Sequence, residues 1–335
     1  MAGYRDILGN EQIKEHLKNA IKLGKVSHAY IFNGAKGMGK KMIAKTFAMA
    51  LQCEKHGEEP CMECQSCRQA LSDNHPDIKF VIHEKPNVIS VDEVRQQLTN
   101  DIQIKPYSGR YKIYIIDEAQ KMNQQAQNAI LKTIEEPPEY GIIILLTSNS
   151  EMFLPTILSR CVIMKMKTME NKQIKEYLMK NMDLPDYYAD VIATFAAGNL
   201  GKAIRLATSE DFNELKDSVV HLLQYIGDME VYEVVQAVKQ AEKYKVDFED
   251  YIDLMMVWYR DVLMYKVSLD IDELTFKEQC RYIKEQAEKI SFNGIEAIIE
   301  AMEKAKIRLK ANVNFDLAIE MMFLTIRDGL NGREP

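Results

Sequence analysis

The sequence contains no apolar run long enough to cross a membrane and no excess of basic charge. Its longest apolar runs, such as residues 141–147, are far shorter than the ~20 residues that a membrane-spanning helix needs. The first ten residues show no basic segment followed by an apolar one, so we expect no secretory signal and a cytoplasmic protein. A net charge of −7, from 43 basic and 50 acidic residues, argues against a protein whose surface is covered with positive charge for binding duplex DNA. Any contact with DNA should therefore be local or shared with partner chains.

Four of the six cysteines lie close together in the sequence, although a disulfide framework is not expected in the cytosol. Their spacing, C-x7-C-x2-C-x2-C, can close a tetrahedral site that leaves no position open for water. The sequence therefore predicts a structural zinc site, with His56 as an alternative ligand and four uncommitted cysteines as the alternative interpretation. Cys161 and Cys280 stand alone, and we expect both to be buried as small hydrophobic side chains. The predicted ligands are Cys53, Cys61, Cys64 and Cys67.

Apolar segments and amphipathic helices alternate over the first half of the chain. This order predicts an α/β domain with a mostly parallel sheet that is covered by helices on both faces. The predicted strands are 28–34, 77–82, 111–117, 141–148 and 161–166. The predicted helices are 10–24, 39–53, 91–101 and 123–136.

The strand pattern ends near residue 167, and a chain of 335 residues predicts two or three domains. We expect an α/β domain over 1–167, which includes the cysteine segment 53–67. Residues 168–210 form a short helical unit in this interpretation. Residues 211–335 contain five or six further amphipathic helices.

Residues 34–41, "GAKGMGKK", nearly match the phosphate-binding loop Gly-x-x-x-x-Gly-Lys-Ser/Thr. Gly34, Gly39 and Lys40 match the pattern, Gly37 adds a further glycine, and Lys41 replaces the hydroxyl residue. That hydroxyl normally binds Mg²⁺, which an ammonium group cannot do because it has no lone pair. A glycine-rich turn without function is the alternative, but the strand before it and the helix after it favour a phosphate loop.

Two further motifs could serve nucleotide chemistry. Asp117 and Glu118 follow an apolar strand, where ATPases of this layout hold Mg²⁺ and polarise the attacking water. Alone, the pair would be an ordinary solvated strand end. Arg160, in "PTILSRC" at 155–161, would be an ordinary exposed arginine if it were considered by itself.

The order of these motifs resembles the clamp-loader branch of the AAA+ ATPases. The phosphate loop, the cysteine cluster, "IIDEA", "TSN" and "LSRC" occur in that family's order, and the resemblance covers essentially the whole chain. It implies a RecA-like domain, then a small helical lid, then a helical collar through which five subunits join in a ring. It also implies that Arg160 acts in trans, as an arginine finger on ATP bound to a neighbouring motor subunit.

Two departures from the family pattern concern ATP itself. Lys41 replaces the hydroxyl residue, and Gly201 stands where the lid normally carries an arginine; Lys202 or Arg205 could compensate. We therefore expect weak or absent binding of ATP and Mg²⁺, no intrinsic ATPase, and a subunit of the DNA polymerase III assembly that acts as a stator. An active motor ATPase is the alternative. The implied partners are gamma/tau motor subunits, a delta subunit, the β sliding clamp and primed DNA.

Overall fold

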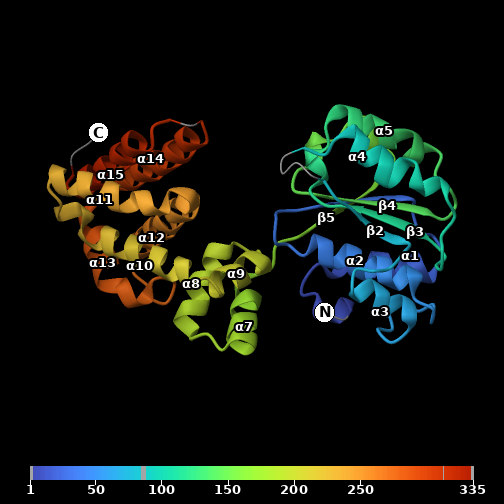
Figure 1. Cartoon of the computed structure of the whole chain (residues 1–335). Coiled ribbons are helices and arrows are strands. Elements are labelled where there is room, and N and C mark those ends of the chain that lie inside the picture. Colours follow the sequence, from blue (N-terminus) through green and yellow to red (C-terminus); the bar gives the residue numbers. More distant parts are fainter. Residues whose placement is uncertain (1–2, 84–87, 312, 333–335) are drawn as a thin grey trace. The chain divides into compact units, whose positions relative to one another are not determined.

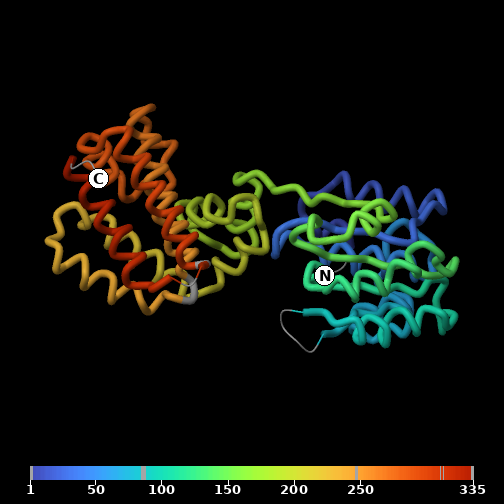
Figure 2. Tube along the Cα trace, turned by 90° about the horizontal axis from the view of Figure 1, so that it is seen from above, coloured from blue at the N-terminus to red at the C-terminus, as the bar shows by residue number. Residues whose placement is uncertain are grey.

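The computed structural model describes residues 3–83, 88–311 and 313–332. The chain divides into two compact units, Met1–Met169 and Glu170–Pro335, which are coloured blue to green and yellow-green to red in Figure 2. The finer subdivision of the second unit near residue 210 remains a prediction.

The first unit is built on a sheet of five parallel strands in the order β2-β3-β4-β1-β5. In the central part of the sheet, Tyr30 lies opposite Ile144 on one side and Val162 on the other. Each strand falls within a segment that the sequence pattern predicts, so the predicted parallel α/β class is confirmed. The strands are β1 (Ala29–Asn33), β2 (Ile78–Val81), β3 (Lys112–Ile116), β4 (Gly141–Thr147) and β5 (Val162–Lys165).

Both faces of the sheet are buried. Successive side chains of each strand point to opposite faces, and the side chains on each face belong to a separate hydrophobic core. Tyr30 and Phe32 belong to the core beneath α1 (Glu11–Lys22) and α2 (Lys40–Gln52), whereas Ile31 belongs to the core on the other face. Figure 1 shows α1, α2 and α3 (Gln65–Leu71) on one side of the sheet. It shows α4 (Val91–Val94) and α5 (Gln124–Glu135) on the other.

The predicted helix 91–101 is not one regular helix. It begins as α4, continues as a π-helical stretch, η2 (Arg95–Thr99), and ends in the 3₁₀ turn η3 (Asp101–Gln103). Val94, Leu98 and Ile102, which are spaced by four residues, are all completely buried. Residues with this spacing lie on one face of a helical segment, and all three belong to the same hydrophobic core as Ile31.

The described part of the second unit is entirely helical. It begins with α7 (Asn171–Met182), α8 (Asp186–Ala196) and α9 (Leu200–Ala207), and six further α-helices follow in the described residues, in agreement with the predicted five or six. Among the described residues, no helix is both long and apolar enough to cross a membrane. The six are α10 (Glu210–Tyr225), α11 (Val231–Ala241), α12 (Phe248–Ser268), α13 (Cys280–Lys289), α14 (Phe292–Lys310) and α15 (Phe315–Leu330).

Candidate functional site

The predicted phosphate loop connects the end of β1 to the start of α2. Gly37 and Gly39 have φ values of +91° and +83°, in the region that side chains disfavour, so glycine is required at both positions. A Cβ on Gly34 would lie 2.6 Å from the Cβ of Met166. The loop therefore packs too closely against the segment after β5 to accept any larger residue at its first position.

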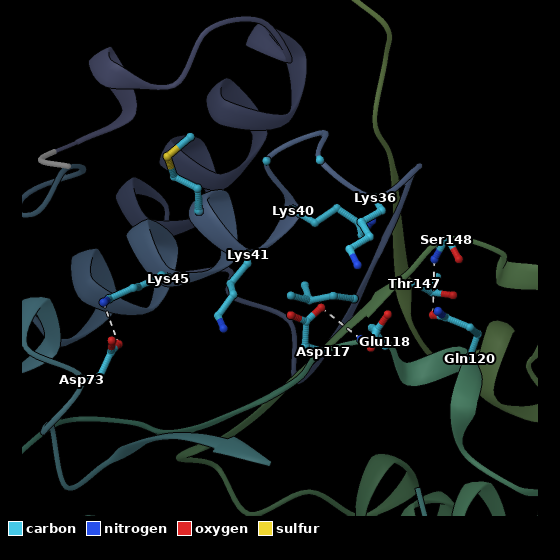
Figure 3. Close-up of a pocket in the computed structure, with 14 residues that line it drawn as sticks. Lys36, Lys40, Lys41, Lys45, Asp73, Asp117, Glu118, Gln120, Thr147 and Ser148 are labelled. Atoms are coloured by element: carbon cyan, nitrogen blue, oxygen red, sulfur yellow. Dashed lines mark hydrogen bonds and ion pairs between the residues drawn. The ribbon is translucent and has the colours of Figure 1, made fainter. Parts of the chain in front are cut away.

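The loop borders a cavity of about 670 Å³ at the carboxyl ends of β3 and β4. Figure 3 shows the charged side chains that surround it. Ligand sites in open parallel sheets lie at this edge. Of the predicted nucleotide-site residues, all except Gly34 line the cavity: Gly37, Gly39, Lys40, Lys41, Asp117 and Glu118. The sequence analysis missed Lys36, Lys45 and Asp73, although Lys45 lies one helical turn after Lys41 and could have been included on that basis.

The lysines around the cavity have different partners. The Lys40 ammonium group donates to the carbonyl oxygens of Gly34 and, at 2.9 Å, Ala35. Burial lowers the pKa of Lys40, and the nearby carboxylates of Asp117 and Glu118 partly oppose that shift. The Nζ of Lys41 lies 5.0 Å from the centroid of the Phe80 ring. Lys45 forms an ion pair of 2.6 Å with Asp73 (Figure 3).

The two carboxylates after β3 are both held by local contacts. Asp117 Oδ1 accepts a hydrogen bond of 3.0 Å from the backbone N–H of Glu118. Glu118 adopts a left-handed backbone conformation, with φ +50°, and its carboxylate pairs with Lys121 Nζ at 2.6 Å. The hydrogen bond from Lys121 lowers the pKa of Glu118 and keeps it ionised. The same contact occupies the carboxylate that the sequence analysis expects to polarise a water molecule.

Arg160 lies outside this cavity. It follows the short helix α6 (Pro155–Leu158), and its guanidinium group donates to the Thr156 carbonyl oxygen and to Ser159 Oγ, both at 3.1 Å. Its Nη2 atom lies 3.0 Å from Glu135 Oε1, and 41% of the arginine side chain is exposed. The structure therefore presents Arg160 on the surface and not to the phosphate loop of its own chain.

The four clustered cysteines meet at one point. Their sulfur atoms all lie within 4.8 Å of one another, and Cys61 Sγ is 4.0 Å from Cys67 Sγ. A tetrahedral zinc with Zn–S bonds of ~2.3 Å requires sulfur atoms ~3.8 Å apart, so the arrangement fits a structural zinc ion. Cys53 directly follows α2, and Cys64 is the N-cap of α3. Within the described residues, the cluster consists of the cysteines alone, and His56 is not part of it.

Backbone N–H groups favour the thiolate form of Cys61, whereas burial raises the pKa of the Cys67 thiol. Cys61 Sγ accepts from the N–H of Cys64, and Cys64 Sγ accepts from the N–H of Cys67, both at 3.4 Å. Hydrogen bonds from the backbone of Glu63 and Cys64 lower the pKa of Cys61 to about 6. Cys161 and Cys280, which were expected to be buried, are only partly buried. Neither belongs to the cluster.

The position of the expected lid arginine lies in α9. Gly201 is in the first turn of this helix, and the two basic residues that could replace the arginine are engaged within the second unit. Lys202 Nζ lies 3.7 Å from Asp250 and 3.8 Å from Asp253, and Arg205 lies 4.0 Å from Asp250.

The strand order and the glycine loop after β1 place the first unit in the RecA-like class of AAA+ P-loop domains. Two family models match the chain: "DNA polymerase III, delta subunit" over residues 9–170, and its C-terminal counterpart over residues 221–328. The chain belongs to this DNA polymerase III subunit family.

Two relatives from one organism agree with the family assignment. The delta′ subunit of DNA polymerase III from Bacillus subtilis is 29% identical over 95% of this chain and 96% of its own length. The tau subunit from the same organism is also 29% identical, over 92% of this chain, but the match spans only 58% of tau. A solved DNA polymerase III gamma subunit-related protein from Thermotoga maritima matches with a TM-score of 0.48 and 17% identity, over 95% of this chain and 99% of that chain.

Proposed function

We propose that this chain is a delta′-type clamp-loader subunit that hydrolyses no ATP and supplies Arg160 to ATP bound by a neighbouring motor subunit. The observation that carries the proposal is the position of Arg160, on the surface and outside the cavity of its own phosphate loop. The match to delta′ over almost the full length of both chains supports the choice of subunit.

The surroundings of Arg160 suit a group that must reach another chain. The Thr156 carbonyl, Ser159 Oγ and Glu135 orient the guanidinium group, and none of these contacts buries it. Arginine binds phosphate through a planar fork of N–H donors. When a neighbour presents a γ-phosphate, the guanidinium group would exchange Glu135 for the phosphate oxygens. An arginine finger of this kind stabilises the charge of the transition state and is worth ~10³ to 10⁵ in rate.

Three features support the absence of hydrolysis in the chain's own cavity. Lys41 offers no lone pair to Mg²⁺, and Lys121 occupies the carboxylate of Glu118. Gly201 has no side chain with which to contact a phosphate. Lys202 and Arg205, which could have compensated for it, lie beside acidic residues of α12.

The cysteine cluster gives the proposed subunit a structural metal. Cys53, Cys61, Cys64 and Cys67 would hold one zinc ion, which cross-links the end of α2 to α3 and leaves no position open for chemistry. The ion would therefore stabilise the fold and take no part in phosphoryl transfer.

The partners follow from the proposed subunit type. They are the gamma/tau motor subunits, which bind and hydrolyse ATP, and a delta subunit, in an assembly of five chains. This complex would load the β sliding clamp onto primed DNA. The net charge of −7 is compatible with DNA contacts that are shared among the subunits.

The proposal is tested by measuring ATP hydrolysis in the clamp loader reconstituted from the same organism, with clamp and primed DNA present. We expect Arg160→Ala to slow hydrolysis at the adjacent motor site by at least a hundredfold. Arg110→Ala removes an exposed arginine of the same unit and should leave the rate unchanged. The isolated chain should hydrolyse no ATP. Equal rates for the Arg160→Ala and wild-type complexes would refute the finger.

An active ATPase is the second candidate, because Lys40, Asp117 and Glu118 still meet around one cavity. It predicts turnover by the isolated chain that depends on Mg²⁺ and is abolished by Glu118→Gln. Turnover that survives this substitution would come from a contaminating ATPase.

A further inference from the structure

The phosphate-loop cavity does not fit the magnesium ion that the fold class normally uses. In a working site, a hydroxyl oxygen at the start of the helix binds the metal directly. Here Lys41 occupies that position and lines the cavity (Figure 3), and its ammonium group lies near the Phe80 ring. It has three donors and no lone pair, and its positive charge repels a dication. The position that normally supplies a metal ligand therefore carries a positively charged side chain in this protein.

The remaining charges of the cavity favour an anion. Lys45 is paired with Asp73, and Glu118 with Lys121. Among the described residues, Asp117 is the one other carboxylate that lines the cavity, and the charges of Lys40 and Lys41 together exceed its charge. Lys40 contacts carbonyl oxygens and Lys41 contacts the face of Phe80, and within the described residues no carboxylate lies within ion-pair distance of either ammonium group. Neither contact is strong competition for a phosphate, because a carbonyl oxygen and an aromatic ring carry only partial negative charge.

The backbone of the loop is also arranged to receive phosphate. The glycine conformations at Gly37 and Gly39 are the ones that allow backbone N–H groups to approach phosphate oxygens. The loop leads into α2, a helix of 13 residues whose N-terminus favours negative charge. The backbone conformation that can bind phosphates is therefore retained, while the side chain that would bind the metal is replaced by Lys41.

We propose that this cavity binds the polyphosphate chain of a nucleotide without Mg²⁺, and that the Lys41 ammonium group supplies the positive charge a metal ion would bring. Rotation of the Lys41 side chain away from Phe80 would bring it to the phosphates, beside Lys40. Mg²⁺ would then weaken binding, because the complex of the metal with the phosphates places a dication against Lys41. The inference rests on the proposed function, since an occupant that cannot be hydrolysed suits a stator.

The test measures binding of ADP, ATP and inorganic tripolyphosphate to the isolated full-length chain by calorimetry, in EDTA and in excess Mg²⁺. We expect binding in EDTA and at least fivefold weaker binding in Mg²⁺. Tripolyphosphate that binds as well as ATP would identify the phosphate chain as the recognised group. If ADP and ATP bind but tripolyphosphate does not, the cavity recognises the whole nucleotide and not its phosphate chain by itself.

Substitutions at Lys41 test whether its positive charge, and not the size of its side chain, determines how Mg²⁺ affects binding. Lys41→Thr restores the hydroxyl and should invert the metal dependence, so that Mg²⁺ strengthens binding. Lys41→Gln should weaken binding in EDTA at least tenfold and gain nothing from Mg²⁺. Lys132→Gln is the matched control, because Lys132 is exposed on α5, which lies on the opposite face of the sheet from α2, and is not among the residues that line the cavity. It should bind as the wild type does.

Wild-type protein that binds only with Mg²⁺, or a folded wild type that binds none of the three ligands under either condition, would overturn the inference. Such a result leaves the arginine finger standing if Arg160→Ala still slows the complex. Conversely, the chain could bind the phosphate chain without metal while the Arg160→Ala complex hydrolyses ATP at the wild-type rate. That result would overturn the arginine finger and leave the inference about the cavity standing.

Discussion

The two ends of α2 carry two candidate ligand sites, which differ in how many of the expected ligand groups are present. At the N-terminal end, the glycine loop retains the backbone shape of a nucleotide site, but Lys41 replaces its metal ligand. At the C-terminal end, Cys53 begins a set of four thiols that is complete and close to zinc geometry.

The difference shows that a site made by backbone tolerates the loss of a side chain better than a site made by side chains. Phosphate is held largely by N–H groups, which every residue of the loop except proline provides. Zinc is held by four sulfur atoms, and removing one of them opens the coordination shell. The loop can therefore remain folded without its metal ligand, whereas the cysteine site depends on all four thiols together.

The largest loss of stability should come from a substitution in the cysteine cluster at the C-terminal end of α2. We expect Cys64→Ser to reduce bound zinc from one ion per chain to none, and to cost on the order of 4 kcal/mol in the free energy of unfolding, because metal binding is coupled to folding. Elemental analysis and thermal unfolding measure the two effects. Cys161→Ser, in the same unit but outside the cluster, should keep its zinc. A Cys64→Ser protein with a full complement of zinc would contradict the proposed ligand set.

Gly34→Ala tests the loop end and should have the next largest effect. The new Cβ would meet the Cβ of Met166 at 2.6 Å, which is a contact that requires the backbone to move. Overpacking of this kind costs ~1–3 kcal/mol. Chemical denaturation should show that loss with the zinc content unchanged, because the cysteines lie at the other end of α2. A loss of zinc would show that the two sites are not independent.

A smaller, pH-dependent effect is expected at His75, which connects the cysteine end of α2 to β2. The ring is 4% exposed, accepts from the N–H of Asp77 at Nδ1 (3.1 Å), and contacts Ser66 Oγ through Nε2 (3.0 Å). Ser66 Oγ in turn donates to the carbonyl of Gln52, the last residue of α2. These contacts require a neutral ring, and burial lowers the pKa of His75.

The sign of the pH effect follows from that lowered pKa. The unfolded chain takes up a proton below pH ~6.5 more readily than the folded chain does, so stability falls as the pH decreases below that value. The slope is at most ~1.4 kcal/mol per pH unit. Urea unfolding at pH 7.5 and 5.5 measures it, and His75→Gln should reduce the difference between the two pH values. An unchanged difference would assign the pH dependence to other groups, including the thiols.

The smallest effect is expected from Glu118→Gln. The pair with Lys121 is partly exposed, so its loss should change stability by less than about 0.5 kcal/mol. The ATPase rate of the reconstituted complex should change less than twofold, in contrast to the large loss expected for Arg160→Ala. A strong decrease would show that the loop end of α2 retains its catalytic chemistry.

Local sequence patterns were sufficient for the five strands and for much of the two sites. The five apolar segments became the five strands, because a buried parallel strand needs side chains that are apolar on both faces. The cysteine spacing led directly to the cluster, since its ligands lie within one short segment. The phosphate loop was recognisable because the glycines and the lysine act at fixed positions next to a strand and a helix.

Long-range contacts were not predictable in this way. Glu135 and Arg160 are 3.0 Å apart, and Lys45 and Asp73 are 2.6 Å apart, yet each pair comes from separate segments of the chain. Nothing in the local pattern around Cys161 or Cys280 indicated that their side chains would be only partly covered. The π-helical stretch after α4 likewise reflects the packing of Leu98 and Ile102 against the sheet and not a local preference.

The sequence by itself determined the class of the fold, the presence of a phosphate loop without its hydroxyl, and the set of clustered thiols, because each depends on residues that are near neighbours in the chain. Only the tertiary structure decided the partners of these groups. Strand order brings the ends of β3 and β4 to the phosphate loop, and the packing of α5 against α6 places Glu135 beside Arg160. The physical reason is that a side chain's charge and solvent exposure depend on every segment packed around it, and not on its own segment alone.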